Sequence, residues 1–404
     1  MRCLVIGAGI VGLSTAYLLG KAGFEVTVVD KGQGPGLGAS YANGAQLSYS
    51  YVAPLAGPGV IPSIPKYLLD PESPLRFRPE LSFEQWAWCI RFLMACNKKK
   101  SDASTRCLYE LAEASRRTLS KVIAEAGLSF DFSENGKMVV YDQVASFDKA
   151  KRDTELLAGL GCHQVVLDGQ QCLEKEPGLR KMAGRIIGGI LSPNDASGNC
   201  HKLCLALSEV ISARGDGSAI LPGIDVRRIL TAGGMVSGVD TNAGILTADL
   251  YVLAAGMGVR PLSRGLGFDL PLYPLGGYSL TAAITNDNMA PAVSITDFGR
   301  KTVYARVGGQ LRSAAFVEIG GAAHADSCRV QQLVRNSEEA FGDAADFSNA
   351  EIWRGFRPAT PDGLPVVGRT PYGNLFINAG HGALGFTLAF GTAASVVQQI
   401  LRRT

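Results

Sequence analysis

A glycine-rich turn near the N-terminus constrains the fold of this chain more than any other feature. Residues 2–7 (RCLVIG) have the composition of a short buried strand, and the motif GAGIVG (residues 7–12) begins at its last glycine. A helical pattern follows, and a second strand-like run over residues 24–30 (FEVTVVD) ends in an acid. This order of strand, G-x-G-x-x-G, helix, strand and acid predicts a βαβ unit that binds a dinucleotide.

Each part of this unit has a physical role in such a site. Gly7 allows a tight turn, Gly9 lets the backbone approach a pyrophosphate, and Gly12 lets the helix pack closely on the strand. The N–H groups that open the helix face the phosphates, while the Asp30 carboxylate accepts hydrogen bonds from the ribose hydroxyls and repels a 2′-phosphate. The unit therefore predicts FAD or NAD, and not NADP. The predicted contacts are Gly7, Gly9, Ile10, Val11, Gly12, Asp30 and Lys31.

A second glycine-rich motif, GHGALG at residues 380–385, bears on the choice between these ligands. It follows a strand-like run over residues 374–379 and opens a helix-like run to residue 404, so the strand and acid of a complete second nucleotide site do not follow it. A helix N-terminus that points at a flavin ring is the better interpretation, because its dipole stabilises negative charge on the reduced flavin.

Length and charge limit the domain number and the class of partner. A chain of 404 residues predicts two domains, and 39 Lys and Arg minus 36 Asp and Glu leave a net charge of only +3, which gives no argument for nucleic-acid binding. Nucleotide-type features predict a discontinuous FAD-binding domain, at residues 1–60, 195–258 and 350–404, and a substrate domain at 61–194 and 259–349. An amphipathic helix is expected over residues 106–126 and a β-meander within 219–253.

The nine cysteines indicate reduced thiols. Their number is odd, their spacing is irregular and no C-x-x-C occurs, so neither a disulfide framework nor a metal site is predicted. The cluster Cys200-His201-x-x-Cys204 lacks a second pair of ligands and is interpreted as a helix start with buried thiols.

The sequence does not lead us to expect a transmembrane helix. Residues 3–19 are uncharged and follow a basic residue, as in a signal peptide, but they contain the dinucleotide motif and no cleavage site followed by a polar linker. We interpret them as a buried strand and helix. We expect no other run that approaches ~20 apolar residues free of charge. The expected location is cytoplasmic.

The helix-like segment at residues 83–97 allows two interpretations. Four apolar residues recur at helical spacing, and three lysines (residues 98–100) follow them. A core-facing helix whose basic C-terminus suits its dipole is favoured. The alternative is a helix with a basic fringe on a membrane surface, which would place the protein peripherally on the cytoplasmic face of the inner membrane. The apolar residues are Trp86, Ile90, Leu93 and Met94.

Over nearly its whole length the chain resembles the FAD-dependent D-amino acid oxidase/glycine oxidase superfamily, and most closely the bacterial D-amino acid dehydrogenase small-subunit family. The resemblance implies an α/β fold in which a Rossmann-type FAD-binding domain carries an inserted α+β substrate domain of mixed or antiparallel sheet. The first and the last two matching segments are specific in combination. The segments are residues 5–30, 40–60 (SYANGAQLSYSYVAPLAGPGV), 192–200 (SPNDASGNC), 273–281 (YPLGGYSLT), 353–368 (WRGFRPATPDGLPVVG) and 378–391 (NAGHGALGFTLAFG).

The resemblance also implies roles for residues at the matching positions. Arg357 is expected to bind the substrate carboxylate, and Tyr278 and Tyr51 are expected to line the pocket. Arg306 is a second candidate for the carboxylate. The implied cofactor contacts beyond the first motif are Ser40, Asn43, Gly44 and Gln46 between phosphates and flavin, Val226 at the adenine, Ala255 and Gly256 beside the cofactor, and Gly380, His381, Gly382, Leu384 and Gly385 at the flavin pyrimidine.

The implied reaction is the oxidative deamination of a D-amino acid. Hydride passes from Cα to flavin N5, the imine hydrolyses to a 2-oxo acid and ammonia, and a quinone or another respiratory acceptor takes the electrons. The FAD is expected to be non-covalent, because no cysteine follows Cys328, whereas the sarcosine-oxidase branch has its flavin-linking cysteine near the C-terminal motif.

The preferred substrate and the assembly stay open at this stage. Gly277 stands where the family often has a lysine, and residues 47–52 lack the usual proline-glycine, so the preferred side chain is not fixed. A dehydrogenase or oxidase of D-hydroxyproline, glycine or sarcosine is an alternative, as is the flavin subunit of a hetero-oligomeric amine or opine oxidase. A rival of another class is a flavin-binding sensor without turnover. An oligomer is compatible with the sequence.

Overall fold

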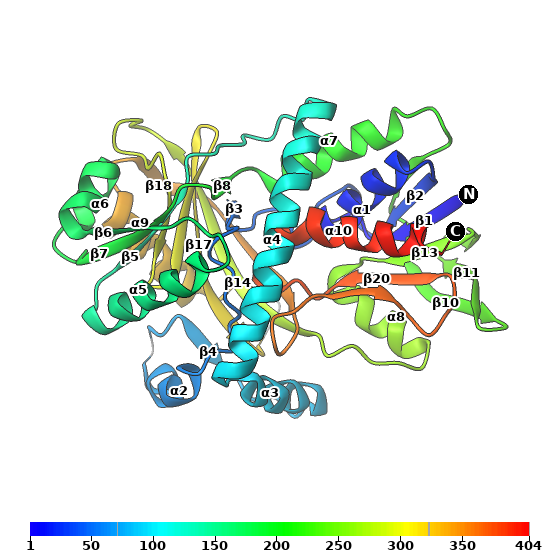
Figure 1. Ribbon diagram of the computed structural model, residues 1–404, viewed down its shortest axis with the longest axis horizontal. Coiled ribbons are helices and arrows are strands. Elements are labelled where there is room, and N and C mark those ends of the chain that lie inside the picture. Colours follow the sequence, from blue (N-terminus) through cyan, green and yellow to red (C-terminus); the bar gives the residue numbers. More distant parts are fainter. Residues whose placement is uncertain (71, 322–323, 404) are drawn as a thin grey trace.

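The computed structural model describes residues 1–70, 72–321 and 324–403, and Figure 1 shows two lobes side by side. The first, here called the nucleotide lobe, is built on a six-stranded sheet in which every neighbouring pair is parallel except β19 and β20. In sheet order its strands are β19 (Val366–Arg369), β20 (Leu375–Ala379), β13 (Leu250–Leu253), β1 (Arg2–Ile6), β2 (Glu25–Asp30) and β9 (Ala219–Pro222).

Both faces of this sheet are covered, which explains why its central strands are largely apolar. On one face, Val5 and Val252 belong to the core formed with α1 (Ile10–Lys21), α7 (Cys200–Ser212) and α10 (Gly385–Leu401). On the other face, Ile6 and Leu253 pack in a second core that includes residues of α8 (Val259–Gly265). The predicted βαβ unit is present as β1, α1 and β2, and α7 begins at Cys200 with Cys200 and Cys204 buried as expected.

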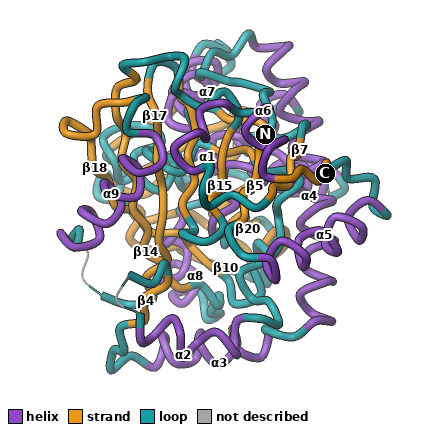
Figure 2. Tube along the Cα trace, turned by 90° about the vertical axis from the view of Figure 1, so that its left-hand side faces the viewer, coloured by secondary structure: helices purple, strands orange, loops and turns teal. Residues whose placement is uncertain are grey.

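The second lobe is built on a nine-stranded mixed sheet with helices packed around it. Its main path is β18 (Ala345–Ala359), β14 (Tyr273–Ile284), β17 (Gln310–Ile319), β16 (Thr302–Val307), β15 (Ser294–Asp297), β5 (Lys137–Tyr141), β7 (Gly188–Ser192) and β6 (Val165–Asp168), with β4 (Leu75–Phe77) beside β17. The helices are α5 (Val144–Ala158), α6 (Gly169–Lys175) and α9 (Ser327–Phe341), the 3-10 turn Pro177–Met182, and α2 (Val60–Leu69) and α3 (Phe83–Ala95), which lie together at one end of the molecule (Figures 1 and 2).

Two small sheets complete the structure. The antiparallel β10 (Val226–Ala232), β11 (Met235–Thr241) and β12 (Gly244–Leu246) form the expected meander, whereas β9 and β13 on either side of it belong to the parallel sheet. The short strands β3 (Gln46–Leu47) and β8 (Ala196–Ser197) pair with each other. The fold expected from the family resemblance is confirmed.

The lobes do not follow the predicted domain boundaries at two places. The boundary expected at residue 350 falls inside β18, which pairs with β14 from Ala345 to Ala359. In addition, α4 (Lys98–Ala126), which the prediction placed in the substrate domain, packs on α10 of the nucleotide lobe and crosses between the lobes in Figure 1. The two helices approach so closely that a Cβ on Gly391 would lie 2.3 Å from the Leu111 carbonyl oxygen.

The three lysines at residues 98–100 open a helix and do not close one, as the favoured interpretation of residues 83–97 had assumed. Asn97 caps α4 through a hydrogen bond that its side chain accepts from the Lys100 N–H group. Positive charge in a first helical turn is unfavourable toward the helix dipole, and only Lys98 has a partner within the helix, Asp102 at 2.8 Å. The dipole argument for a core-facing helix is therefore wrong.

The core-facing stripe predicted for this segment is wrong as well. Helix α3 forms at Phe83–Ala95, but it buries Gln85, Trp88, Phe92 and Ala95. The predicted stripe lies on the protein surface, with exposed fractions of 47% for Trp86, 57% for Ile90, 40% for Leu93 and 63% for Met94.

One helical segment, Gly382–Leu401, is long and apolar enough to cross a membrane by length and composition. This finding corrects our expectation that, beyond residues 3–19, no apolar run free of charge approaches ~20 residues. In the structure 61% of its apolar window is buried, and α10, which makes up most of it, packs between α1 and α4 in the core of the nucleotide lobe.

Candidate active site

The turn after β1 has a shape that only glycine allows at two positions. Gly7 has a φ of +115°, and a Cβ there would lie 2.5 Å from the Ala254 carbonyl oxygen. A Cβ on Gly12 would lie 1.8 Å from the carbonyl oxygen of Gly7, so the helix could not pack on the turn. At Gly9 a Cβ would meet only the Ser40 Oγ, at 3.5 Å, and the space in front of that backbone is open. The motif therefore combines a tight turn with an approachable backbone.

Free hydrogen-bond donors face this open space. Gly9 is the N-cap of α1 and makes no side-chain cap, and the Ile10 N–H donates to Ser40 Oγ at 3.0 Å. Within the described residues, the N–H groups of Val11 and Gly12 have no acceptor. Unpaired N–H groups at a helix N-terminus bind phosphate, so this turn fits the pyrophosphate of a dinucleotide.

Asp30 supports the same turn from the end of β2. Its Oδ2 accepts from the Ala8 N–H and its Oδ1 from the Gly32 N–H, both at 2.7 Å. Each carboxylate oxygen keeps a lone pair for a ribose hydroxyl. Lys31, which follows it, is exposed. Asp30 thus fixes the glycine turn and offers the acceptors that an adenosine ribose needs.

The other predicted cofactor residues lie around this turn and in the crossing between the lobes. A Cβ on Gly7 would lie 2.8 Å from the Ala255 Cα, so residues 254–256 border the motif, and Val226 begins β10 beside the second core of the nucleotide lobe. Asn43 accepts from the Ala45 N–H at 3.0 Å. The Gln46 amide donates to Ser294 Oγ at 2.8 Å and therefore reaches into the second lobe.

The C-terminal motif lies against the strand that carries Arg357. His381 forms an isolated bridge with Ala359 of β18, and residues Gly382–Leu384 form a 3-10 turn before α10. The His381 ring is buried with its Nε2 2.9 Å from Thr392 Oγ1, and burial lowers its pKa to about 4, so the ring is neutral. The His381 ring is therefore engaged within the fold, and the motif would meet a ligand mainly through its backbone at the start of α10.

Arg357 is a half-buried guanidinium without an acidic partner. Its Nη1 donates to the Phe316 carbonyl at 2.8 Å and to the Gly276 carbonyl at 3.3 Å. A Cβ on Gly277 would lie 2.5 Å from the guanidinium, so this glycine makes the room in which the guanidinium lies. No carboxylate in the described part of the chain pairs with it, and burial lowers its pKa to about 10. The Nε and Nη2 edge is thus free to receive an anion.

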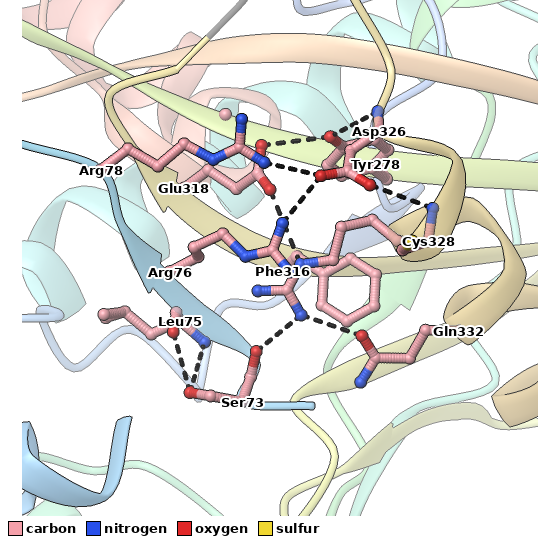
Figure 3. A network of polar contacts seen from close by, with 12 residues as sticks. Ser73, Leu75, Arg76, Arg78, Tyr278, Phe316, Glu318, Asp326, Cys328 and Gln332 are labelled. Atoms are coloured by element: carbon pink, nitrogen blue, oxygen red, sulfur yellow. Dashed lines mark hydrogen bonds and ion pairs between the residues drawn. The ribbon is translucent and has the colours of Figure 1, made fainter. Parts of the chain in front are cut away.

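Tyr278 does not share this pocket. It faces Arg354 across the β14–β18 pair, while Arg357 faces Leu275, so the two side chains stand on opposite faces of the sheet. The Tyr278 hydroxyl donates to Glu318 at 3.1 Å inside a buried network (Figure 3). The structure therefore corrects the prediction that Tyr278 lines the pocket beside Arg357.

Tyr51 also lies away from Arg357. The Lys137 ammonium stands 4.4 Å above the Tyr51 ring, and Lys137 belongs to β5, five strands from β18 in the sheet. At the usual strand spacing this separation is roughly 20–25 Å. Arg306, the second carboxylate candidate, pairs with Asp287 and lines a cleft of about 340 Å³ with Asp131 and Ser197. Neither joins Arg357 in the structure.

Sequence reasoning missed two buried charged groups, Lys137 and Asp195, beside the loop at residues 47–52. The Lys137 ammonium, 2% exposed, donates to Ser48 Oγ at 2.8 Å, and Asp195 accepts from the Ser50 N–H at 2.8 Å. Burial lowers the pKa of Lys137 to about 8 and raises that of Asp195 to about 6. Because Ser48 also donates its N–H to Thr387 of α10, Lys137 supports the crossing between the lobes through Ser48. A lysine in an otherwise apolar strand, KMVVY, was the available signal.

The described residues contain no group of three or more His, Cys, Asp or Glu side chains that could hold a metal ion.

Comparisons with known proteins agree with this geometry. Residues 2–399 match the family model described as "FAD dependent oxidoreductase" (DAO). The chain is 44% identical to "D-amino acid dehydrogenase 2" of Pseudomonas aeruginosa, over 100% of this chain and 95% of that protein. It is 42% identical to "D-amino acid dehydrogenase 2" of Ralstonia nicotianae, over 100% of this chain and 97% of that protein.

Solved structures share the fold at low identity. Glycine oxidase from Geobacillus kaustophilus superposes with a TM-score of 0.76 at 22% identity, covering 100% of this chain and 95% of that one. L-proline dehydrogenase from P. horikoshii superposes with a TM-score of 0.74 at 18% identity, covering 99% of this chain and 93% of that one.

Proposed function

The chain belongs to the DAO family of FAD-dependent oxidoreductases, and from that premise we propose that its substrates are D-amino acids. The reaction is FAD-dependent oxidative deamination. The names of the relatives with 36–44% identity support the D-configuration. The observation on this chain that carries the proposal is Arg357, a guanidinium without an acidic partner that lies beside the start of α10.

Arg357 binds and orients the substrate. Its Nη1 is held by two backbone carbonyls, so the guanidinium plane is fixed and its other edge can form two parallel hydrogen bonds with a carboxylate. A substrate bound in this way has a fixed carboxylate plane, which places its Cα near the cofactor. FAD, when bound, supplies the acceptor for the hydride that leaves Cα.

The nucleotide lobe holds the cofactor for this step. The free N–H groups of Val11 and Gly12 bind the pyrophosphate, Asp30 binds the ribose, and the backbone of residues 380–385 approaches the flavin. The substrate amine must be neutral when hydride leaves, and the imine hydrolyses in water to a 2-oxo acid and ammonia. We expect the FAD to be non-covalent, so acid precipitation of the protein should release all the flavin into the supernatant.

An anaerobic visible spectrum tests the reaction and its handedness together. The purified holoenzyme is titrated with D-alanine and L-alanine, and then with other pairs of enantiomers. Bleaching of the flavin absorbance by D-isomers alone supports the proposal. Bleaching by glycine, sarcosine or L-isomers, and not by any D-amino acid tested, would contradict it, and a flavin that no amine reduces would favour a sensor.

We further propose that the protein passes its electrons to a quinone at a membrane surface, with α3 as the contact. The outer face of α3 carries exposed apolar side chains: Phe83 is 88% exposed, Ile90 57% and Met94 63%. On the inner face, Trp88 packs on Tyr273 of β14 and Ala359 of β18. An exposed apolar stripe on one helix is typical of helices that lie in a lipid interface.

The charges around this stripe fit an anionic lipid surface. Arg91 on α3 is exposed, and so are the lysines at residues 98–100 in the first turn of α4. The lysines oppose the dipole of α4, so they are unfavourable for the helix itself. Attraction to anionic headgroups, worth about 1 kcal/mol for each basic residue, is a physical reason for such a cluster.

Vesicle sedimentation tests this contact. The double variant Ile90→Ser with Met94→Ser should lose binding to vesicles of anionic lipid and retain the activity with a water-soluble quinone. Ile245→Ser is the control, because Ile245 is also 63% exposed but lies on β12 of the nucleotide lobe. Equal binding by the wild type and the double variant would contradict the role of α3. Equal binding of the wild type to neutral and to anionic vesicles would contradict the role of the basic residues.

A further inference from the structure

Strand β17, which pairs with β14 on the side away from β18, contains an irregularity. Where β14 pairs with β17, Gly276 faces Glu318 but Tyr278 faces Ala315, so β17 contains one extra residue at this point. Phe316 lies in this bulge with a φ of +70°, a conformation that glycine usually supplies. A phenylalanine remains there only if its surroundings hold it. The Phe316 carbonyl is the acceptor that Arg357 Nη1 contacts at 2.8 Å.

A buried polar network holds the Phe316 side chain (Figure 3). The Tyr278 ring meets the Phe316 ring edge-on with 5.9 Å between centroids, and the Arg329 guanidinium carbon lies 4.7 Å from the centroid of the same ring. Arg329 is 1% exposed and is fixed in turn, because its Nη1 donates to the Ser73 carbonyl at 2.8 Å and to Gln332 at 2.9 Å. The Phe316 ring is therefore held by two side chains that cannot easily move.

Glu318 balances the charge of this network. Its carboxylate accepts from the Tyr278 hydroxyl at 3.1 Å and from Arg354 Nη2 at 2.9 Å, and its Oε1 lies 3.6 Å from Arg329 Nε. Two buried guanidinium groups thus share one buried carboxylate, which lies two residues after Phe316 on the same strand. Removal of Glu318 would leave the buried Arg329 guanidinium without this carboxylate in a site of low dielectric constant.

The two faces of the sheet are linked through this bulge. A Cβ on Gly276 would lie 3.2 Å from Arg354 Nη2, whereas a Cβ on Gly277 would lie 2.5 Å from the Arg357 guanidinium. Consecutive glycines therefore leave room for the network on one face and for Arg357 on the other. The Phe316 backbone is common to both, because its ring belongs to the network and its carbonyl to Arg357.

We infer that Tyr278, Glu318 and Phe316 form a positioning unit that aligns Arg357 for the substrate carboxylate from the opposite face of the sheet. The inference rests on the proposed role of Arg357. Bidentate recognition of a carboxylate tolerates little rotation of the guanidinium, and the Phe316 carbonyl limits that rotation. Tyr278 is then a positioning residue that acts through Phe316 and does not touch the substrate.

Three variants of the holoenzyme test the unit. Tyr278→Phe removes the hydroxyl and keeps the ring, and we expect it to raise KM for D-amino acids about three- to tenfold with kcat changed less than about twofold. The Kd of propanoate, measured from its effect on the flavin spectrum, should rise by the same factor. Tyr304→Phe is the matched control, because Tyr304 is 0% exposed and donates to the Asn336 carbonyl at 3.1 Å in the same lobe. Arg357→Lys tests the clamp itself.

The outcomes separate the two proposals. If Arg357→Lys weakens propanoate binding and Tyr278→Phe does not, the positioning unit is refuted and the clamp stands. If Arg357→Lys leaves propanoate binding unchanged, the clamp is refuted and the unit with it. Equal losses in Tyr278→Phe and Tyr304→Phe would indicate a general loss of stability and would overturn the inference. Should Tyr278→Phe not fold, Phe316→Leu takes its place with the same expected rise and the same refuting result.

Discussion

Substitution of Arg357 gives the sharpest test of the candidate site. In Arg357→Met the side chain keeps its apolar contacts, but the edge that receives a carboxylate disappears. Nη1 is already committed to the Phe316 and Gly276 carbonyls, so the substrate is bound by the remaining Nε and Nη2 edge. In Arg357→Lys the charge stays, but one ammonium cannot replace the fork that serves two carbonyls and a carboxylate together.

The magnitude follows from the number of hydrogen bonds lost. A hydrogen bond to a charged group contributes about 1.5–3 kcal/mol, so the loss of two in Arg357→Met costs about 3–6 kcal/mol. Since about 1.4 kcal/mol is a factor of ten, kcat/KM should fall by about 10²–10⁴. Arg357→Lys loses one of the two bonds and should fall by about 10–10². The loss should appear mainly in KM, because the carboxylate is bound equally in the ground state and in the transition state.

The assay is steady-state oxidation of a D-amino acid with a soluble acceptor, with the flavin content of each variant measured from its visible spectrum. Arg306→Met is the control, since Arg306 is paired with Asp287 and lies away from Arg357. A fall of less than about tenfold in Arg357→Met, at full flavin content, would refute the clamp.

The pH dependence adds an independent check on the same residue. The folded-state pKa of Arg357, about 10, lies below its ordinary value of 12.5 because burial disfavours the charged form. An arginine side chain nevertheless keeps its proton wherever the protein stays folded, so the affinity of Arg357 for a carboxylate should not change between about pH 7 and 10. A loss of propanoate affinity over that range would contradict a permanently charged Arg357.

Three further predictions concern the cofactor and the stability of the fold. Asp30→Ala should purify with less than about a tenth of the flavin of the wild type, because the turn loses its acceptors for Ala8 and Gly32 together with the ribose acceptor; full flavin content would contradict this role. Ala45→Gly should lower the free energy of unfolding by less than about 1 kcal/mol in a denaturant titration, because relief of the backbone at a φ of +56° offsets the loss of a buried methyl group and the added chain entropy; a loss above about 2 kcal/mol would contradict strain at this position. Lys137, with a pKa lowered from 10.5 to about 8, binds fewer protons in the folded than in the unfolded state between these values, so stability should rise from pH 8 to 10.5, and Lys137→Met should flatten that rise; equal slopes in both proteins would refute it.

The sequence was sufficient where local chemistry determines the structure. The turn at Gly7 and Gly12, the open backbone at Gly9 and the acid at Asp30 are read from spacing, because a strand and a helix joined by three glycines pack in one way. Arg357 was found through its resemblance to a family pattern. The surroundings of Arg357 could not be predicted from the sequence. The carbonyls that hold it belong to Gly276 and Phe316, which come together only through the pairing of β14 and β17.

The face of a strand was not predictable in the same way. Tyr278 and Arg357 lie on neighbouring strands, and a shift of one residue in the pairing would have put both on the same side. No local feature of the sequence gives this register. The bulge at Phe316 is equally hidden, because the residue in the left-handed conformation is an aromatic and not the glycine that would have signalled it.

Helix α3 shows why composition alone can mislead about burial. It has apolar residues on two sides, Trp88 and Phe92 on one and Ile90 and Met94 on the other, and either stripe satisfies the helical period. The structure buries the side that meets Tyr273 and leaves the other side to water. An apolar stripe left on the surface of a helix favours a second apolar partner, and the lysines that open α4 against its dipole limit what that partner can be. The membrane contact proposed above would satisfy both conditions, because the acyl region of an anionic membrane would accept the stripe and its headgroups would accept the lysines.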